Sequence, residues 1–284
     1  MIENIGIDYS HLDRQEILSG LFHPRIESGP GEKPANAIDL LIPAEGNIVI
    51  GGRFHITCKD APNILFFHGN GEIVSDYDDL GPLYNRMGMN FLPVDYRGYG
   101  RSTGIPTVTN MMRDCYTVFD FAREWLKNNG HTGTFIVMGR SLGSAPALEL
   151  ANHYMEQIDG LIIESGFAYT GPLLQLLGVN TSTMGFTEEM GLRNIDKIRT
   201  WGKPALVIHA EFDHIIPYRE GQALYDACPS QDKRLLKVPD ANHNDIFIRG
   251  MDEYMKEVKA LSGCRESQDR KDRASRHCFK NLPS

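Results

Sequence analysis

Long apolar runs are absent from this 284-residue sequence, because nowhere do 18 uncharged apolar residues follow one another. A helix needs about 20 predominantly apolar residues to cross a bilayer, so no stable membrane insertion is expected. The first eight residues, MIENIGID, lack the basic segment and the apolar core of a secretory signal. We therefore expect a cytoplasmic protein.

Cysteine is scarce, and its spacing is irregular. The cysteines are odd in number and form no CxxC pair: Cys58, Cys115, Cys228, Cys264 and Cys278. Disulfide frameworks and zinc sites need paired cysteines at short, regular spacing. The sequence thus indicates a reducing compartment and predicts no metal centre.

Basic residues are in deficit, with 29 Lys and Arg against 37 Asp and Glu, which gives a formal net charge of -8. A nucleic-acid partner would require a basic surface, so this class of partner is not expected. The hydrophobic share of 41% and the charged share of 23% are ordinary for a globular protein. The chain is long enough to bury a sizeable core, which excludes disorder of the whole chain.

Short apolar runs alternate with segments of helical period. Most of the later runs are continuously apolar, as in strands buried on both faces of a parallel sheet. Such alternation predicts a doubly wound α/β sheet. The expected strands are residues 37–42, 48–57, 63–67, 90–95, 134–138, 160–163, 204–209 and 234–238. The expected helices are residues 73–89, 108–127, 142–155, 219–227 and 245–261.

Three segments do not follow this alternation of strands and helices. Residues 1–36 are expected to form an N-terminal extension, with a short helix over 12–22 and a proline-broken loop after it. Residues 166–203 hold no single clear helix but many apolar side chains, which favours a packed lid inserted in the catalytic domain of residues 37–261. Residues 262–284 are charged and aperiodic, and we expect a disordered basic tail.

A candidate nucleophile lies in the sequence Gly139-Arg140-Ser141-Leu142-Gly143, which matches G-x-S-x-G. An expected strand precedes it and an expected helix follows it, which is the context of a nucleophile elbow. There, small glycines allow the tight turn that carries Ser141, and the helix N-terminus faces a developing oxyanion. The sequence therefore predicts Ser141 as a nucleophile.

A serine hydroxyl needs a general base, and the base needs an orienting acid. His243 is the best base, because it lies in a loop after the last expected strand. Asp213 is the best acid, because it lies in a loop at the carboxyl end of the strand at 204–209, where parallel sheets place function. Glu164, which ends the preceding strand, is the rival acid, and we expect it to be structural.

The tetrahedral intermediate needs two backbone N–H donors. One is expected from Leu142, directly after the nucleophile, and the other from Asn70 in the loop His68-Gly69-Asn70-Gly71. The arginines of the turn-rich segment at 95–102 could contact an anionic substrate, but internal salt bridges are the favoured interpretation. Arg140 is also expected to make structural contacts.

With these segments placed, the chain resembles the α/β-hydrolase superfamily. Within it, the motifs HGNG, DYRGYGRSTG, GRSLGS and ANHND resemble the serine-aminopeptidase-like branch that includes the α/β-hydrolase-domain depalmitoylases. The resemblance implies a mostly parallel, eight-stranded sheet with helices on both faces and a short lid. The chain departs from the family in having His209-Ala210 where members often have His-Gly, and in lacking the N-terminal cysteine cluster of the membrane-attached depalmitoylases.

These residues together predict a serine hydrolase that acts on a small-molecule acyl ester or thioester through an acyl-enzyme, without metal or organic cofactor. Two alternatives remain open. An aminopeptidase or amidase would use the same triad and an acidic recess for the substrate amine, which Glu164 or Glu211 could supply. A non-catalytic binding protein could keep the fold, although it has no need of a complete triad. The sequence identifies no protein partner.

Overall fold

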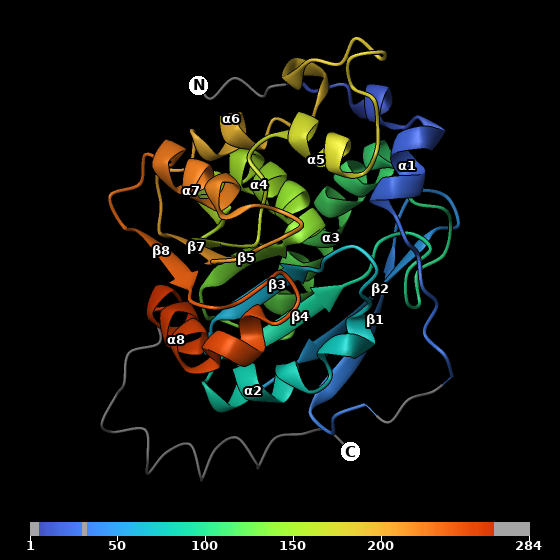
Figure 1. Cartoon of the computed structure of the whole chain (residues 1–284). Coiled ribbons are helices and arrows are strands. Elements are labelled where there is room, and N and C mark those ends of the chain that lie inside the picture. Colours follow the sequence, from blue (N-terminus) through green and yellow to red (C-terminus); the bar gives the residue numbers. More distant parts are fainter. Residues whose placement is uncertain (1–5, 30–32, 264–284) are drawn as a thin grey trace.

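The computed structural model describes residues 6–29 and 33–263, which are built around one eight-stranded sheet (Figure 1). The strand order is β1-β2-β4-β3-β5-β6-β7-β8. The β1–β2 and β2–β4 pairs are antiparallel, and all other neighbours are parallel. The strands are β1 (Ala37–Pro43), β2 (Val49–His55), β3 (Asn63–Phe67), β4 (Asn90–Val94), β5 (Phe135–Arg140), β6 (Gly160–Glu164), β7 (Ala205–Ala210) and β8 (Lys233–Val238).

Helices cover both faces of this sheet (Figure 1). Helices α2 (Leu80–Arg86) and α8 (Ile246–Leu261) pack on one face, and their buried side chains form one core cluster. The other face carries a larger cluster and the remaining helices. These are α1 (Gln15–Leu21), α3 (Val108–Asn128), α4 (Ser144–His153), α5 (Thr170–Leu176), α6 (Asn194–Ile198) and α7 (Tyr218–Ala227). No helix of the described residues is long and apolar enough to span a bilayer.

The predicted doubly wound, mostly parallel sheet is confirmed, and each expected strand is present. One expected helix, over residues 73–89, is instead a 3-10 turn (Val74–Tyr77) followed by α2. Pro82 explains this break, because it has no N–H to donate and is tolerated only in the first turn of a helix. Helix α2 therefore begins at Leu80.

The N-terminal segment packs into the same core as the rest of the domain. A 3-10 turn (Tyr9–Leu12) and α1 bury Leu12 and Ile17 completely, within the larger core cluster. Further along, Ile26 forms a β-bridge with Gly100. The described part of the N-terminal extension expected over residues 1–36 therefore packs against the domain of residues 37–261 and shares its core.

The lid segment, residues 166–203, contains α5, a 3-10 turn (Glu188–Met190) and α6. Its side chains Leu174, Leu192 and Trp201 are fully buried in the larger core cluster. Of the expected tail over 262–284, all but the first two residues lie outside the described residues.

A buried ion pair anchors the lid to the helix behind the elbow. Lys197 of α6 is 1% exposed, and its Nζ lies 2.7 Å from Oε2 of Glu149 in α4. Glu149 also accepts hydrogen bonds from the hydroxyls of Tyr9 (2.7 Å) and Tyr116 (2.5 Å). Burial alone would raise the pKa of Glu149, but Lys197 and the two tyrosines hold it below its ordinary value. The carboxylate therefore joins the N-terminal segment, α3, α4 and the lid.

Replacing Lys197 by methionine is expected to lower the free energy of unfolding by about 3 kcal/mol, because it leaves the Glu149 carboxylate buried without its counter-ion. Urea unfolding followed by circular dichroism measures this change. The matched control is Arg199→Met, which removes an exposed cation paired with Asp196 and should cost less than about 1 kcal/mol. Equal losses in both variants would contradict the role of the buried pair.

Candidate active site

Ser141 lies on a sharp turn between β5 and the helices that follow it. Its φ is +52°, a left-handed conformation that side-chain-bearing residues rarely adopt. A Cβ at Gly139 would lie 2.1 Å from the carbonyl oxygen of Gly143, and a Cβ at Gly143 would lie 2.0 Å from that of Phe67. Only glycine fits at these two positions, so the G-x-S-x-G pattern follows from the packing of the elbow against β3.

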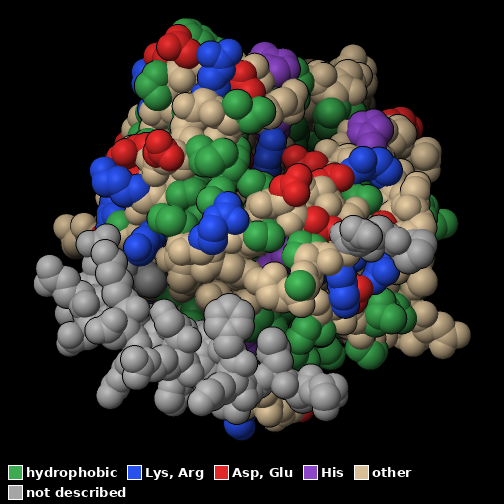
Figure 2. Space-filling view, turned by 90° about the horizontal axis from the view of Figure 1, so that it is seen from below, with side chains coloured by type: hydrophobic (Ala, Val, Ile, Leu, Met, Phe, Trp, Pro, Cys, Tyr) green, Lys and Arg blue, Asp and Glu red, His purple; other side chains and the backbone are tan. Residues whose placement is uncertain are grey.

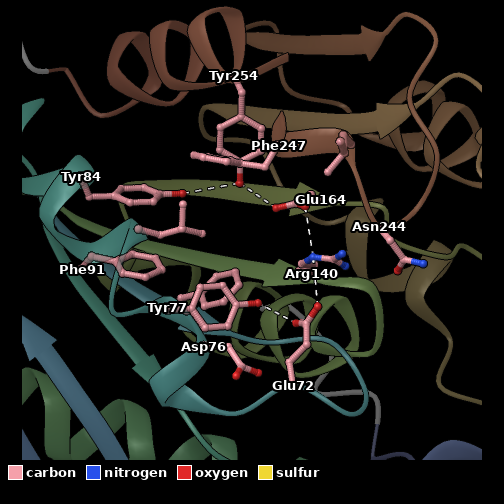
Figure 3. A pocket seen from close by; sticks show the side chains of 13 residues that line it. Glu72, Asp76, Tyr77, Tyr84, Phe91, Arg140, Glu164, Asn244, Phe247 and Tyr254 are labelled. Carbon is pink, nitrogen blue, oxygen red and sulfur yellow. Dashed lines mark hydrogen bonds and ion pairs between the residues drawn. The ribbon is translucent and has the colours of Figure 1, made fainter. Parts of the chain in front are cut away.

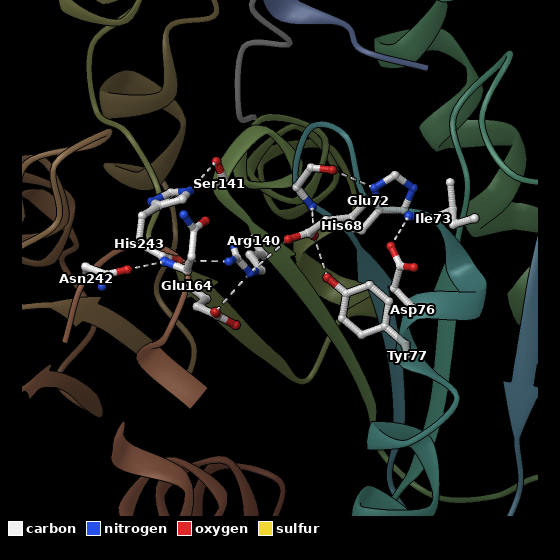
Figure 4. Close-up of polar contacts among 12 residues, drawn as sticks. His68, Glu72, Ile73, Asp76, Tyr77, Arg140, Ser141, Glu164, Asn242 and His243 are labelled. Carbon is white, nitrogen blue, oxygen red and sulfur yellow. Dashed lines mark hydrogen bonds and ion pairs between the residues drawn. The ribbon is translucent and has the colours of Figure 1, made fainter. Parts of the chain in front are cut away.

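The three residues expected to form a triad lie in hydrogen-bond contact. His243 Nε2 is 3.1 Å from Ser141 Oγ, and His243 Nδ1 is 2.7 Å from Asp213 Oδ2 (Figure 4 draws the first contact). Ser141, His243 and Asp213 are 8%, 5% and 7% exposed. The three side chains come from the elbow after β5, the loop after β8 and the loop after β7, which meet at the carboxyl edge of the sheet.

The Asp213 carboxylate is held in one orientation and in the ionised state. Its Oδ1 accepts hydrogen bonds from the backbone N–H groups of Ile215 (3.0 Å) and Ile216 (2.8 Å). Burial alone would raise the pKa of Asp213, but the hydrogen bond and charge of His243 and the Ile216 N–H hold it below its ordinary value. An ionised acid requires the proton on Nδ1 of His243, which leaves Nε2 free to accept the serine proton.

Glu164, the rival acid, contacts Tyr254 and Arg140. Its Oε2 accepts a 2.6 Å hydrogen bond from Tyr254, and its Oε1 is 3.3 Å from Nε of Arg140. Burial raises its pKa above the ordinary value. The structure thus brings Asp213 to His243 and holds Glu164 against Arg140 and Tyr254, in agreement with the structural role expected for Glu164.

The loop after β3, expected to supply an oxyanion donor, is held by contacts with distant segments. The Asn70 side-chain oxygen accepts hydrogen bonds from the backbone N–H of His23 and the hydroxyl of Tyr99, both at 2.8 Å. Its Nδ2 lies 2.7 Å from His23 Nδ1. Because the Asn70 side chain is engaged in these contacts, its backbone N–H is the group that can serve as a donor. The contact with His23 was missed, since no local pattern links positions 47 residues apart.

Leu142, the other expected donor, stands at the start of a helical segment. It lies in the 3-10 turn Ser141–Gly143 that leads into α4. The first N–H groups of a helix have no carbonyl partner inside the helix, so they form a natural anion site. The turn is secured by the Ser144 hydroxyl, which donates a 2.7 Å hydrogen bond to the carbonyl of Ser141.

The two arginines of the segment at 95–102 make internal contacts, as expected. Arg97 forms a bidentate pair with Asp114, with distances of 2.6 and 2.8 Å. Arg101 pairs with Glu27 (2.9 Å) and Asp39 (2.8 Å). The segment at 95–102 is therefore a turn held by salt bridges.

A cavity of about 330 Å³ lies between the lid and the loop that carries Asp213. Its volume is at the lower end of the range for ligand pockets. Most of its lining is apolar and comes from α5 and the residues before it, and from the loop at 211–217 that carries Asp213 (the acid loop); it includes Phe167, Leu173, Leu176 and Ile215. The arrangement provides an apolar recess beside the acid of the triad.

The part of the chain that contains the nucleophile elbow matches a known family. A family model described as serine aminopeptidase, S33, matches residues 59–186. This segment contains the loop after β3, the elbow and α4, in the strand order already described. The chain belongs to the α/β-hydrolase superfamily.

Similar sequences include α/β hydrolase domain-containing proteins of vertebrates. Protein 17B of Homo sapiens is 31% identical over 204 residues, which are 69% of this chain and 64% of the relative. Protein 17C of Xenopus tropicalis is 32% identical over 205 residues, which are 69% of this chain and 60% of the relative. The match thus spans less than two thirds of the length of these relatives.

Solved structures share the fold at lower identity. The esterase Pf2001 of Pyrococcus furiosus superposes with a TM-score of 0.68 at 18% identity, covering 85% of this chain and 98% of that one. Est1E of Butyrivibrio proteoclasticus, solved with ferulic acid, has a TM-score of 0.66 at 17% identity, covering 80% and 100%. These likenesses show a common α/β-hydrolase fold.

No group of three or more metal-ligating side chains occurs among residues 6–29 and 33–263. On the face seen in Figure 2, acidic and basic side chains are interspersed over the described surface. This face lies on the side of α2 and α8.

Proposed function

We propose that the protein is a serine hydrolase that cleaves carboxylic ester or thioester bonds. The observation that carries this proposal is the unbroken hydrogen-bond chain from Ser141 through His243 to Asp213, with distances of 3.1 and 2.7 Å. His243 Nε2 takes the hydroxyl proton as Ser141 Oγ attacks the substrate carbonyl carbon. Asp213 keeps the imidazole oriented and stabilises the imidazolium that forms.

In the proposed reaction, the tetrahedral oxyanion is held by the backbone N–H groups of Asn70 and Leu142. The carbon–oxygen or carbon–sulfur bond to the leaving group then breaks, and the imidazolium of His243 donates its proton to that group. The remaining acyl-enzyme is attacked by water, which His243 deprotonates, and the acid and free serine are released. Every proton moves between the substrate, water and His243, so the cycle needs neither a metal nor an organic cofactor.

The apolar cavity beside the acid loop supports an acyl substrate. Its side chains Leu173, Leu176 and Phe167 offer hydrocarbon contacts, and transfer of hydrocarbon from water into such a site is favourable. The structural relatives include an esterase, which agrees with ester chemistry on this fold. We propose that this cavity takes the acyl chain of the substrate.

The same triad in an aminopeptidase is less well supported, because both carboxylates that could hold a substrate amine are engaged. Glu164 is bound by Arg140 and Tyr254. Glu211 accepts contacts from Lys237 Nζ (2.8 Å) and from the backbone N–H of Asp240 (3.2 Å). An amine would have to displace these partners, so ester or thioester cleavage is the favoured activity.

Three substrate series test this function on the purified protein: p-nitrophenyl esters of increasing acyl length, the matching acyl thioesters, and aminoacyl p-nitroanilides. We expect turnover of the first two series above the background of a Ser141→Ala variant, and none of the anilides. The reason is that most of the pocket lining is apolar and that its carboxylate, Glu220, already accepts hydrogen bonds from the backbone N–H groups of Ala168 (3.1 Å) and Tyr169 (3.2 Å). The dependence of kcat/KM on acyl length then measures the length of chain that the pocket accepts.

Two outcomes would overturn the proposal. A higher kcat/KM on the anilides than on the esters would establish an aminopeptidase. Turnover of no series, together with no labelling of Ser141 by a fluorophosphonate probe, would establish a non-catalytic binding protein with this fold.

A further inference from the structure

Arg140 joins the elbow to two other loops of the site. It ends strand β5 and directly precedes Ser141, so its backbone forms part of the elbow. Its side chain is 12% exposed and lies among the segments that carry His243, Glu72 and Glu164 (Figure 4). A single guanidinium is thereby in contact with three parts of the chain that are far apart in sequence.

The first contact holds the loop at 239–245 that carries His243, which we call the histidine loop. Arg140 Nη2 donates a 2.9 Å hydrogen bond to the backbone carbonyl of His243. The position of that carbonyl determines where the imidazole stands, and its Nε2 must reach Ser141 Oγ. Since Arg140 and Ser141 are adjacent, this bond fixes the histidine loop relative to the nucleophile itself.

The second contact holds the loop at 68–71 after β3, which carries the proposed donor Asn70 and which we call the oxyanion loop. Arg140 Nε lies 3.4 Å from Oε1 of Glu72. Oε2 of Glu72 accepts 2.6 Å hydrogen bonds from the backbone N–H of Gly69 and from the hydroxyl of Tyr77. Gly69 directly precedes Asn70, the proposed oxyanion donor. The guanidinium therefore reaches the oxyanion loop through one carboxylate.

The positive charge of Arg140 is needed to hold the carboxylates of Glu72 and Glu164 close together. Glu72 and Glu164 both face the guanidinium, so one cation separates two carboxylates. Burial alone would lower the pKa of Arg140, but these carboxylates raise it above its ordinary value. Without the guanidinium, the two carboxylates would repel each other in a poorly solvated site. A lysine carries the charge but presents one compact ammonium in place of the planar, multidentate guanidinium.

We propose that Arg140 is a positioning residue for the hydrolysis, which sets the His243 carbonyl and the Glu72–Gly69 contact at fixed places relative to Ser141. This inference rests on the proposed function, since it concerns the rate of that reaction. The guanidinium contacts the His243 carbonyl and the two carboxylates rather than the hydroxyl of Ser141, so it acts through the two loops. Its removal should lower kcat with little change in KM, because the acyl cavity lies on the lid side of the triad.

A second cavity, of about 330 Å³, makes the proposal testable by chemical rescue. It lies between α2 and α8, beneath the histidine loop (Figure 3). Its lining includes Arg140, Glu72, Glu164, Asn244, Phe247 and Tyr254. Truncation of the arginine side chain would enlarge this cavity at the place where the guanidinium stood. Free guanidinium could then enter and bind the same two carboxylates.

The experiment compares wild-type protein with Arg140→Met and Arg140→Lys, using a p-nitrophenyl ester that the wild type turns over. We expect kcat to fall about 100-fold in Arg140→Met and about 10-fold in Arg140→Lys, with KM within about three-fold, because small displacements of catalytic groups cost this much. Millimolar guanidinium should raise kcat of Arg140→Met about ten-fold. Urea, which has a similar shape but no charge, should not raise it.

A matched control separates positioning from general loss of stability. Arg53 is also a buried arginine held by carboxylates, Glu27, Asp39 and Asp78, but it lies on β2, away from the triad. Arg53→Met should lose thermal stability while its folded fraction keeps the wild-type kcat, and guanidinium should give no gain in kcat. If Arg140→Met does not fold, Glu72→Gln provides the second variant, with an expected fall in kcat at nearly unchanged KM.

A readout that needs no substrate distinguishes failure of this inference from failure of the proposed function. The proton between His243 Nδ1 and Asp213 should give a low-field ¹H resonance in the wild type, and Arg140→Met or Arg140→Lys should shift or broaden it. If the wild type hydrolyses neither esters nor thioesters, the proposed function fails, and an altered resonance would still support positioning. Wild-type kcat and an unaltered resonance in the folded Arg140 variants would overturn the inference.

Discussion

Replacing Ser141 by alanine is expected to lower kcat/KM for a p-nitrophenyl ester by about four to six orders of magnitude. The variant lacks the Oγ atom that lies 3.1 Å from His243 Nε2, so no acyl-enzyme can form. Residual turnover would come from the oxyanion donors and substrate binding alone. Stopped-flow or steady-state release of p-nitrophenol measures the loss, and a fluorophosphonate probe should label wild-type protein and not the variant.

The control for this substitution is Ser182→Ala, which changes an exposed serine of the lid and should keep wild-type turnover and labelling. A Ser141→Ala protein that still accepted the probe and retained a tenth of the wild-type turnover would place the nucleophile elsewhere. Circular dichroism should show the same fold in both variants, since the substitution at the elbow removes a single oxygen atom.

Replacing Asp213 by asparagine is expected to lower kcat by about 10⁴-fold, while substrate binding changes little. The carboxylate accepts the Nδ1 proton of His243 at 2.7 Å, whereas an amide can donate a proton there and favour the wrong tautomer of the imidazole. The backbone hydrogen bonds to Oδ1 are accepted equally well by an amide oxygen. The loss should therefore appear in kcat, measured on the same ester, and the variant should remain folded.

The matched control is Asp240→Asn, which removes one negative charge from an exposed side chain near His243 in the histidine loop. It should keep the wild-type kcat, because Asp240 has no contact with the imidazole. Near-wild-type turnover in Asp213→Asn, combined with loss of turnover in Glu164→Gln, would reverse the assignment of the acid.

The pH dependence of Asp213 follows from its lowered pKa. Since the folded-state pKa lies below the ordinary value, the ionised carboxylate contributes stability above the unfolded pKa, near 4. That contribution is lost as the pH falls through the lower folded-state value. The orienting carboxylate therefore stays charged throughout the range in which a histidine base is usable.

Local sequence was sufficient to predict much of the fold and to single out three side chains that the structure brings into hydrogen-bond contact. The continuous apolar runs indicated the strands because burial on both faces removes the polar alternation of an exposed strand. The pattern at Gly139, Ser141 and Gly143 indicated the elbow, since Cβ atoms at either glycine would collide with backbone oxygens. Chain order then placed Asp213 and His243 in loops at the same edge of the sheet.

Other features have no counterpart in local sequence. No pattern in the N-terminal extension shows that Leu12 and Ile17 are buried in the larger core cluster. The hydrogen bonds of Asn70 with His23 and Tyr99, and the engagement of Glu164 by Arg140 and Tyr254, join residues that are tens of positions apart. Such pairs depend on which strands become neighbours, and the order β4-β3-β5-β6 is not the order of the chain.

The sequence by itself determined the α/β class, the elbow at Ser141 and the loops that carry Asp213 and His243. Each of these depends on a run of adjacent residues with its own conformational or burial requirement. The tertiary structure alone decided how the loops are held together, above all the contacts of Arg140 with His243 and Glu72. Those contacts arise when separate loops meet at one edge of the sheet. Their energy depends on distance and burial in space, which the spacing of residues along the chain does not encode.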